Sequence, residues 1–260
     1  MEKMKIKIIT HCHPKDTVAP LLVSTISHHL SEKAMVNAEE EPDIVHVFGA
    51  WNNHTFKAVT HYANLKIPVV YSPLGGITPW MVKAKRNTLH GLAQLRSQRA
   101  AIMRANSLVA FSKTEVQMAR KWIDDQKILE LRNAVITNKY PISTLIAELL
   151  RHYEQVIATH DRTIREHIDT QVNGMHIEDD NIRTLLCKIL YLQYEQHRGT
   201  IHHPTLQDLS QHLIELDFDE DLFVQTVRHA KLLKFVSILQ DKMSKECGLT
   251  EGFMPIPLKS

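Results

Sequence analysis

The distribution of apolar residues divides the chain into two regions with different periodicities. From residue 5 to residue 136, short runs rich in Val and Ile alternate with stretches of helical spacing. The runs predict strands at 6–10, 44–48, 68–72, 108–111 and 128–131. The helical spacing predicts helices at 18–30, 54–64, 88–106 and 114–123. Because such alternation is typical of right-handed βαβ units, we predict a parallel sheet of about five strands with helices on both faces.

The second region has almost no strand pattern. Apolar side chains recur every three or four residues from 143 to 172, which predicts one long amphipathic helix that ends at Asn173–Gly174. Further helices are predicted at 179–197, at 205–216 with Thr205 as the N-cap, and as one continuous helix at 219–245. The sequence therefore predicts an α/β domain at 1–140, an all-α helical bundle at 141–250 and a poorly ordered tail at 251–260.

Composition adds few constraints on partners. The 260 residues suffice for one large domain or two small ones, and 31 Lys and Arg against 29 Asp and Glu neither favour nor exclude nucleic acid. The three cysteines are far apart, as is typical of a reducing compartment. The apolar run near the amino terminus is too short for a signal peptide, and no run approaches the roughly 20 residues of a spanning helix. We expect a cytoplasmic protein, and attachment to a membrane surface remains open.

Two glycine-containing loops are the first candidates for a binding site. Residues 49–54 (GAWNNH) follow the second predicted strand, and residues 72–76 (SPLGG) follow the third. Ligands of open parallel sheets bind at the carboxyl ends of the strands, and glycine lets a ligand approach the backbone closely. The alternative is that both loops are only tight turns from strand to helix.

A resemblance to a known family is carried by several consecutive segments. The stretch PDIVHVFGAWNNHTFKAVTHYANLKIPVVYSPLGGITPW (42–80), the basic segment 83–117 and LRNAVIT (131–137) resemble the amino-terminal, acceptor-side half of family-four glycosyltransferases. That family has two Rossmann-like domains that face each other across a cleft. The resemblance, over about residues 5–137, implies a Rossmann-like parallel sheet, here followed by an all-α domain in place of the second Rossmann-like domain.

Three departures from the family pattern bear on activity. The first predicted strand is followed by HCHPKD (11–16), which has no glycine where the family has a Gly-Gly loop. Leu74 stands where the family has a His, and Leu can neither donate nor accept a hydrogen bond. Residues 138–260 carry none of the family's donor-site motifs. The domain therefore lacks the groups that would hold a donor diphosphate and stabilise its developing charge.

The resemblance, with these departures, implies a glycosyltransferase-related protein of surface-glycan synthesis. It would be an accessory or degenerate transferase, inactive alone and of the hexosyltransferase class if active. We expect no cofactor, and a nucleotide-sugar donor only together with a partner transferase subunit. The acceptor would be a glycan or a lipid-linked glycan. The alternative is a non-enzymatic binding or regulatory protein that reuses the fold, with the helical domain binding a protein partner.

The residues expected to contact a ligand lie around the ends of the predicted strands. They are His11, His13, Gly49, Trp51, Asn52, Gly75, Gly76, Ser112 and Asn133. No catalytic residue is assigned. Lys85, Arg86, Arg96 and Arg104 form a basic patch, which is either a solvated face or a contact for anionic lipid or a phosphorylated glycan acceptor. Arg99 falls within the apolar stripe of Leu92, Leu95 and Ile102, so we expect it to pair with an acid or to extend toward solvent.

Metal and DNA are not expected as partners. His11 and His13 flank Cys12 at the end of the first strand, but strand alternation points the histidines to one side and the cysteine to the other, so we predict no metal site. Residues 205–233 resemble a helix-turn-helix in outline only. This segment is rich in acids, whereas a DNA reader needs basic charge for phosphate contact, so we predict no nucleic acid partner.

Overall fold

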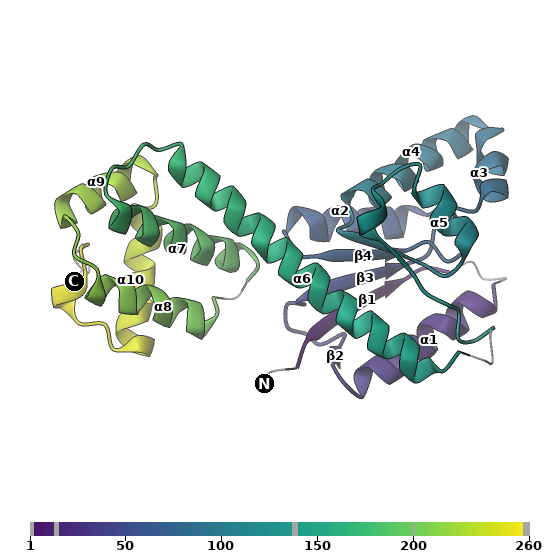
Figure 1. Ribbon diagram of the computed structural model, residues 1–260, viewed down its shortest axis with the longest axis horizontal. Coiled ribbons are helices and arrows are strands. Elements are labelled where there is room, and N and C mark those ends of the chain that lie inside the picture. Colours follow the sequence, from purple (N-terminus) through teal and green to yellow (C-terminus); the bar gives the residue numbers. More distant parts are fainter. Residues whose placement is uncertain (1–2, 13–15, 137–139, 200, 257–260) are drawn as a thin grey trace. The chain divides into compact units, whose positions relative to one another are not determined.

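The structure is a computed structural model that describes residues 3–12, 16–136, 140–199 and 201–256. The chain forms two compact units, Met1–His160 and Asp161–Ser260. The division falls within one long helix, α6 (Ile142–Asn173; Figure 1). The first half of α6 contributes to the core of the first unit, and its second half contributes to the core of the second. Each unit is described by itself below.

The first unit contains a six-stranded sheet in which every neighbouring pair is parallel. The strands are β1 (Lys5–Thr10), β2 (Met35–Val36), β3 (Ile44–Phe48), β4 (Val69–Ser72), β5 (Ser107–Ala110) and β6 (Ile128–Glu130), in the order β2-β1-β3-β4-β5-β6. This confirms the predicted Rossmann-like α/β fold. The two-residue strand β2 was not predicted, because it is too short to show a periodicity and exists through its pairing with β1.

Helices cover both faces of this sheet, as predicted. Alternate strand residues such as Val45, Val47 and Tyr71 face α2 (Asn53–Asn64), α4 (Leu89–Arg104) and α5 (Lys113–Ala119). Their neighbours, such as Ile44 and Phe48, face α1 (Val18–Ser31) and the first half of α6. Strands buried on both sides explain the continuous apolar runs in the sequence. A short helix, α3 (Pro79–Arg86), precedes α4, and a 3-10 turn, Asp125–Lys127, precedes β6.

The described residues of the second unit form helices joined by short loops, with no strand among them. It consists of the second half of α6 with α7 (Asp180–His197), α8 (His203–Glu215), α9 (Glu220–His229) and α10 (Leu233–Cys247), followed by a 3-10 turn at Glu251–Phe253. The predicted single helix at 219–245 is wrong. Lys231 adopts a left-handed conformation (φ 59°) that separates α9 from α10, and Leu232 directly after it is buried. Ile256, which the sequence placed in a poorly ordered tail, is also buried in this core.

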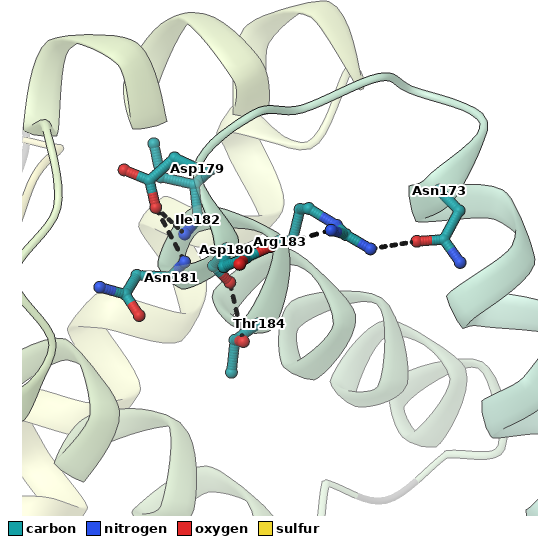
Figure 2. A network of polar contacts seen from close by, with 7 residues as sticks. All are labelled: Asn173, Asp179, Asp180, Asn181, Ile182, Arg183 and Thr184. Atoms are coloured by element: carbon teal, nitrogen blue, oxygen red, sulfur yellow. Dashed lines mark hydrogen bonds and ion pairs between the residues drawn. The ribbon is translucent and has the colours of Figure 1, made fainter.

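Polar side chains fix the start of α7 and the turn that precedes it. The Asp179 carboxylate accepts hydrogen bonds from the backbone N–H groups of Asn181 and Ile182, which begins α7, and Arg183 donates to Asn173 at the end of α6 (Figure 2). The start of α8 differs from the prediction. The helix begins at His203, with Pro204 in its first turn, where the missing N–H costs nothing.

Thr205 is therefore not the N-cap of α8. Its hydroxyl instead donates to the Glu195 carboxylate at 2.9 Å, and the same carboxylate accepts from the backbone N–H of His202 at 3.0 Å.

None of the helices in the described residues combines the length and the apolar composition that crossing a bilayer requires.

Candidate functional site

A small cavity of about 200 Å³ lies where the carboxyl ends of β4, β5 and β6 meet the start of α1. Its lining consists of Asp16, Val18, Ala19, Leu22, Leu74, Gly75, Phe111, Ser112, Glu115, Asn133 and Ile136. This is the edge of a parallel sheet at which ligands of such folds bind. Three of the residues expected to contact a ligand, Gly75, Ser112 and Asn133, are brought together here.

Glu115 is the most unusual group in the lining. Its side chain is fully buried, and its two carboxylate oxygens accept hydrogen bonds from the backbone N–H groups of Gly75 (2.5 Å) and Phe111 (3.1 Å). Burial raises the pKa of Glu115 to about 7, although both hydrogen bonds favour the charged form. A carboxyl group that titrates near neutrality beside a cavity can accept a hydrogen bond from a ligand hydroxyl or exchange a proton with it.

Glu115 was not among the expected site residues, although the sequence held a signal for it. Ser112 and Glu115 have the spacing of a capping box, S-x-x-E, at the start of α5. The Ser112 hydroxyl accepts from the Glu115 backbone N–H at 3.3 Å, as such a box requires. The Glu115 carboxylate, however, accepts from Gly75 and Phe111 and so links the loop after β4 to the end of β5.

The start of α1 is occupied by a carboxylate of this chain. Asp16 Oδ1 accepts hydrogen bonds from the backbone N–H groups of Val18 (3.0 Å) and Ala19 (3.1 Å). Helix N-termini bind phosphate through such N–H groups and through the positive end of the helix dipole. Asp16 therefore satisfies the donors that a phosphate would use and places a negative charge in the same position.

The other predicted residues in the lining also make internal contacts. Asn133 Oδ1 accepts from the backbone N–H groups of Val135 and Ile136, at 3.0 and 3.2 Å, and so holds the turn after β6. Leu74 stands where the family that the sequence resembles has a His. It is half-buried and packs against the core shared by α1 and α6. Its backbone is left-handed, with φ of 51°, which turns the loop toward Gly75.

The predicted residues of the loop after β3 lie outside the cavity lining and hold the loop in place. The Trp51 indole N–H donates to the Gly76 carbonyl at 2.6 Å, and Asn52 caps α2 by accepting from the Thr55 backbone N–H. Gly49 has φ of 110°, and a Cβ added there would lie 2.2 Å from the His11 carbonyl oxygen. The glycine is therefore required by the backbone itself. Ligand contact by these residues stays a prediction.

A buried amide connects α4 to this loop. Gln98 Oε1 accepts from the Trp51 backbone N–H at 3.1 Å, and Gln98 Nε2 donates to the Tyr71 hydroxyl at 2.8 Å. That hydroxyl in turn donates to the Gly49 carbonyl at 2.7 Å. The expected apolar stripe on this helix is therefore wrong in part. Ile102 is buried and Leu95 is partly buried, whereas Gln98 lies in the core and Leu92 and Arg99 are exposed to solvent.

The two histidines near the end of β1 are only partly described. The His11 backbone N–H donates to the Phe48 carbonyl at 3.1 Å, and its ring lies 5.9 Å from the ring of His54. His13 lies outside the described residues. Within the described ranges, no three His, Cys, Asp or Glu side chains lie close enough together to hold a metal ion.

The predicted basic patch divides into engaged and exposed cations. Lys85 Nζ donates to Gln94 at 2.6 Å and lies 5.4 Å from the centre of the Trp51 ring. Arg104 donates to the Thr60 hydroxyl at 3.2 Å. Arg86 and Arg96 are exposed. The four residues therefore do not converge on a single ligand position.

The helical unit contains a larger cavity, of about 820 Å³, between the second half of α6, α7 and the start of α8. No sequence pattern predicted it. Its charged groups face one another: Lys188 pairs with Asp208 at 2.5 Å, Arg183 pairs with Asp180 at 2.9 Å, and the Arg165 guanidinium stacks 3.9 Å from the centre of the Tyr191 ring. Positive and negative side chains are balanced in the lining, so the charge of this cavity does not indicate which kind of ligand it would bind.

Comparison with known proteins gives limited similarity. No protein-family model matches the chain, and no curated protein matches it. Among solved structures, UDP-GlcNAc 2-epimerase from Methanocaldococcus jannaschii is 15% identical with a TM-score of 0.38, over 80% of this chain and 68% of that chain. UDP-N-acetylglucosamine 2-epimerase from Rickettsia bellii is 10% identical with a TM-score of 0.38, over 83% of this chain and 66% of that chain. Similarity at this level does not indicate a shared activity.

Proposed function

We propose that the first unit binds the sugar-bearing acceptor of a glycosyl transfer reaction, and that the chain does not transfer sugar alone. The acceptor, a glycan or a lipid-linked glycan, would occupy the cavity beside Leu74 and Glu115. The observation that carries the proposal is the carboxylate of Asp16 on the first N–H groups of α1. It closes the phosphate position of this edge and leaves the adjacent cavity to the uncharged sugar ring of an acceptor rather than to a donor diphosphate.

Donor chemistry needs groups that this unit lacks among its described residues. A leaving diphosphate must be held by positive charge or by free N–H donors as its charge develops. The Val18 and Ala19 N–H groups are taken by Asp16, whose own charge repels a phosphate. Leu74 offers no hydrogen bond where the resembling family has a His. A nucleotide-sugar would therefore have to be held by a partner transferase subunit.

The lining of the cavity suits a sugar ring. Sugars present hydroxyl groups at their edges and C–H groups on their faces. The cavity offers Leu22 and Leu74 for the apolar face and the Glu115 carboxyl for a hydroxyl. A carboxylate forms the stronger, charge-assisted kind of hydrogen bond with such a hydroxyl.

Calorimetric titration of the purified chain with nucleotide-sugars and with polyprenyl-phosphate glycans tests this proposal. Ala19 lines the cavity and is 8% exposed, so Ala19→Leu fills the cavity, whereas Ala158→Leu adds the same atoms at an exposed position of α6. We expect a glycan to bind, the first variant to weaken binding at least about tenfold, and the second to leave it unchanged.

Two results would contradict the proposal. Turnover of a nucleotide-sugar by the purified chain, abolished by a change at Gly75 or Gly76, would show that the chain is an autonomous transferase. The second result is that no glycan tested binds, while the helical unit binds a protein partner. That result would favour the alternative of a non-enzymatic regulatory protein that reuses the fold.

A further inference from the structure

One segment of the first unit carries no acidic residue. From Ile44 to Thr114, 71 residues, the chain has nine Lys and Arg and no Asp or Glu. They are Lys57, Lys66, Lys83, Lys85, Arg86, Arg96, Arg99, Arg104 and Lys113. The other 189 residues carry 22 basic and all 29 acidic residues, so a chain of net charge +2 has a strongly basic segment within an acidic remainder. Such separation indicates an anionic partner for the segment.

Within this segment, α4 turns three of its large apolar side chains, Leu89, Leu92 and Met103, toward solvent. Leu89, Leu92, Arg96, Arg99 and Met103 follow one another at helical spacing on one face, and all five are exposed. The opposite, buried face consists of Gly91, Gln98, Ala101 and Ile102, with Leu95 partly buried. Leu89 is 87% exposed and Met103 is 53% exposed. A face that combines exposed leucine and methionine with arginine is typical of helices that lie in a membrane interface.

The preceding helix extends this face. Trp80 is 62% exposed at the start of α3, and Lys83 follows it by three residues, on the same side of the helix. The end of α3 lies tightly against α4, since a Cβ on Gly91 would be 2.0 Å from the Lys85 carbonyl oxygen. Figure 1 shows the two helices as a hairpin at one corner of the first unit.

We define the α3–α4 surface by its exposed apolar and basic residues. They are Trp80, Lys83, Arg86, Leu89, Leu92, Arg96, Arg99 and Met103. No carboxylate of the described residues forms an ion pair with its four cations. The cations are therefore available to a partner.

We propose that the α3–α4 surface binds the face of an anionic lipid bilayer. The four cations would attract acidic headgroups, and Trp80, Leu89 and Leu92 would enter the boundary between headgroups and acyl chains. Tryptophan is enriched at that depth, and leucine gains free energy there that a nucleic acid partner would not supply. The inference is independent of the proposed function, because it concerns different residues and needs no sugar.

Co-sedimentation with vesicles measures the attraction. We expect the full chain to bind vesicles of phosphatidylcholine mixed with phosphatidylglycerol, to bind vesicles of phosphatidylcholine alone weakly, and to dissociate as salt is raised. Each charge should contribute about fivefold to the partition coefficient, so the double variant Arg96→Gln, Arg99→Gln should lower it about 25-fold. The charge-matched control Lys121→Gln, Lys234→Gln, at exposed positions elsewhere, should lower it much less.

Insertion has its own readout and its own control. Fluorescence quenching by lipids brominated along the acyl chain should occur in the wild type, and Trp80→Phe should abolish it, since Trp51 and Trp122 are partly buried in the first unit. Leu89→Ser should weaken binding to the mixed vesicles several-fold, whereas Ile214→Ser, at a position 48% exposed in the helical unit, should not.

Three results would overturn the proposal. The first is failure of the folded wild type to bind the mixed vesicles. The second is equal loss of binding in the Arg96, Arg99 variant and its control, which would show attraction by overall charge alone. The third is binding of single-stranded RNA that depends on Arg96 and Arg99 in the absence of vesicle binding, which would assign the surface to nucleic acid.

Discussion

The hydroxyl oxygen of Tyr153 lies 2.6 Å from Nδ1 of His46, and this contact joins α6 to the middle of β3 inside the first unit. The other ring nitrogen, Nε2, lies 2.8 Å from the Ser72 hydroxyl, which donates to the Val109 carbonyl at 3.0 Å. Ser72 must therefore accept from Nε2–H, which leaves Nδ1 to accept from Tyr153. Burial lowers the pKa of His46 well below its ordinary value, so the ring stays neutral.

Removing the Tyr153 hydroxyl should destabilise the first unit. Tyr153→Phe leaves Nδ1 of a fully buried histidine without a donor, so we expect the free energy of unfolding to fall by about 1–3 kcal/mol. Urea denaturation followed by tryptophan fluorescence measures this, since all three tryptophans lie in the first unit. Tyr140→Phe removes a hydroxyl that donates to Glu148 at a partly exposed position, and it should cost less. Equal losses would contradict the assigned network.

The buried carboxyl of Glu115 should make the first unit less stable as pH rises from about 4.5 to about 7. In this window the unfolded chain loses the Glu115 proton first, because burial raises the pKa to about 7 in the folded state from 4.5. We compare the free energy of unfolding of the wild type with that of Glu115→Gln. The difference should fall by on the order of 3 kcal/mol between pH 4.5 and pH 7 and stay level at higher pH. A difference that does not change with pH would show that Glu115 titrates normally.

His152 should act in the opposite direction. Burial lowers its pKa to about 4, and its Nε2 lies 2.7 Å from the Ser107 hydroxyl, which donates to the Lys127 carbonyl. The neutral form is favoured in the folded state, so its contribution to stability is present above about pH 6.5 and is lost as pH falls toward 4. His152→Gln keeps a donor for Ser107 and should flatten this acid-side loss. An unchanged pH profile in the variant would contradict the shift.

Three glycines separate steric from conformational effects on stability. At Gly49 φ is 110°, and an alanine Cβ would lie 2.2 Å from the His11 carbonyl oxygen. We therefore expect Gly49→Ala to lower the free energy of unfolding by about 3 kcal/mol or more. At Gly75 φ is 83° but nothing lies within 4 Å, so Gly75→Ala should lose about 1 kcal/mol. Gly252→Ala has neither problem and should change stability by less than about 0.5 kcal/mol. A similar loss at all three positions in denaturant unfolding would contradict this order.

Two fully buried glutamines should respond differently to the same substitution. Gln98→Leu removes the acceptor of the Trp51 backbone N–H and the donor to the Tyr71 hydroxyl, which keeps its own bond to Gly49, and should lower the free energy of unfolding by about 1–3 kcal/mol. Gln240 has no hydrogen-bond partner for its amide among the described residues. Gln240→Leu should therefore leave stability unchanged or raise it by about 1 kcal/mol. Thermal unfolding followed by circular dichroism measures both variants. A lower stability of Gln240→Leu would contradict the prediction, because it would mean that the Gln240 amide has a hydrogen-bond partner.

The sequence was sufficient for elements whose pattern is local. The strand predicted at 44–48 has the same bounds in the structure, because five consecutive buried residues leave an unmistakable apolar run. The break between α9 and α10 has no such signal. Lys231 takes a left-handed conformation without a Gly or Pro nearby, because the reversal places Leu232 in the core of the helical unit. Tertiary packing decided that position, and no local propensity reports it.

The edge of the sheet that carries the cavity was predictable, but the contacts within the cavity were not. The rule for parallel sheets located the edge, and three expected residues line the cavity. The partners of the Glu115 carboxylate could not be predicted, because its bond from Gly75, 40 residues earlier, depends on how two loops meet. The acid-free segment was different. It could have been counted from the sequence, whereas the outward direction of Leu89 and Met103 needed the fold.

The carboxylate on the first turn of α1 also sets a competition. Any anion that approaches Val18 and Ala19 must displace Asp16, which is tethered two residues away and has an effective concentration at those N–H groups of about millimolar or more. Free phosphate or a nucleotide present below that level would lose this exchange to the chain's own side chain. In this arrangement the Asp16 side chain acts as an intramolecular competitor for anions, and removing its carboxylate would free both N–H groups.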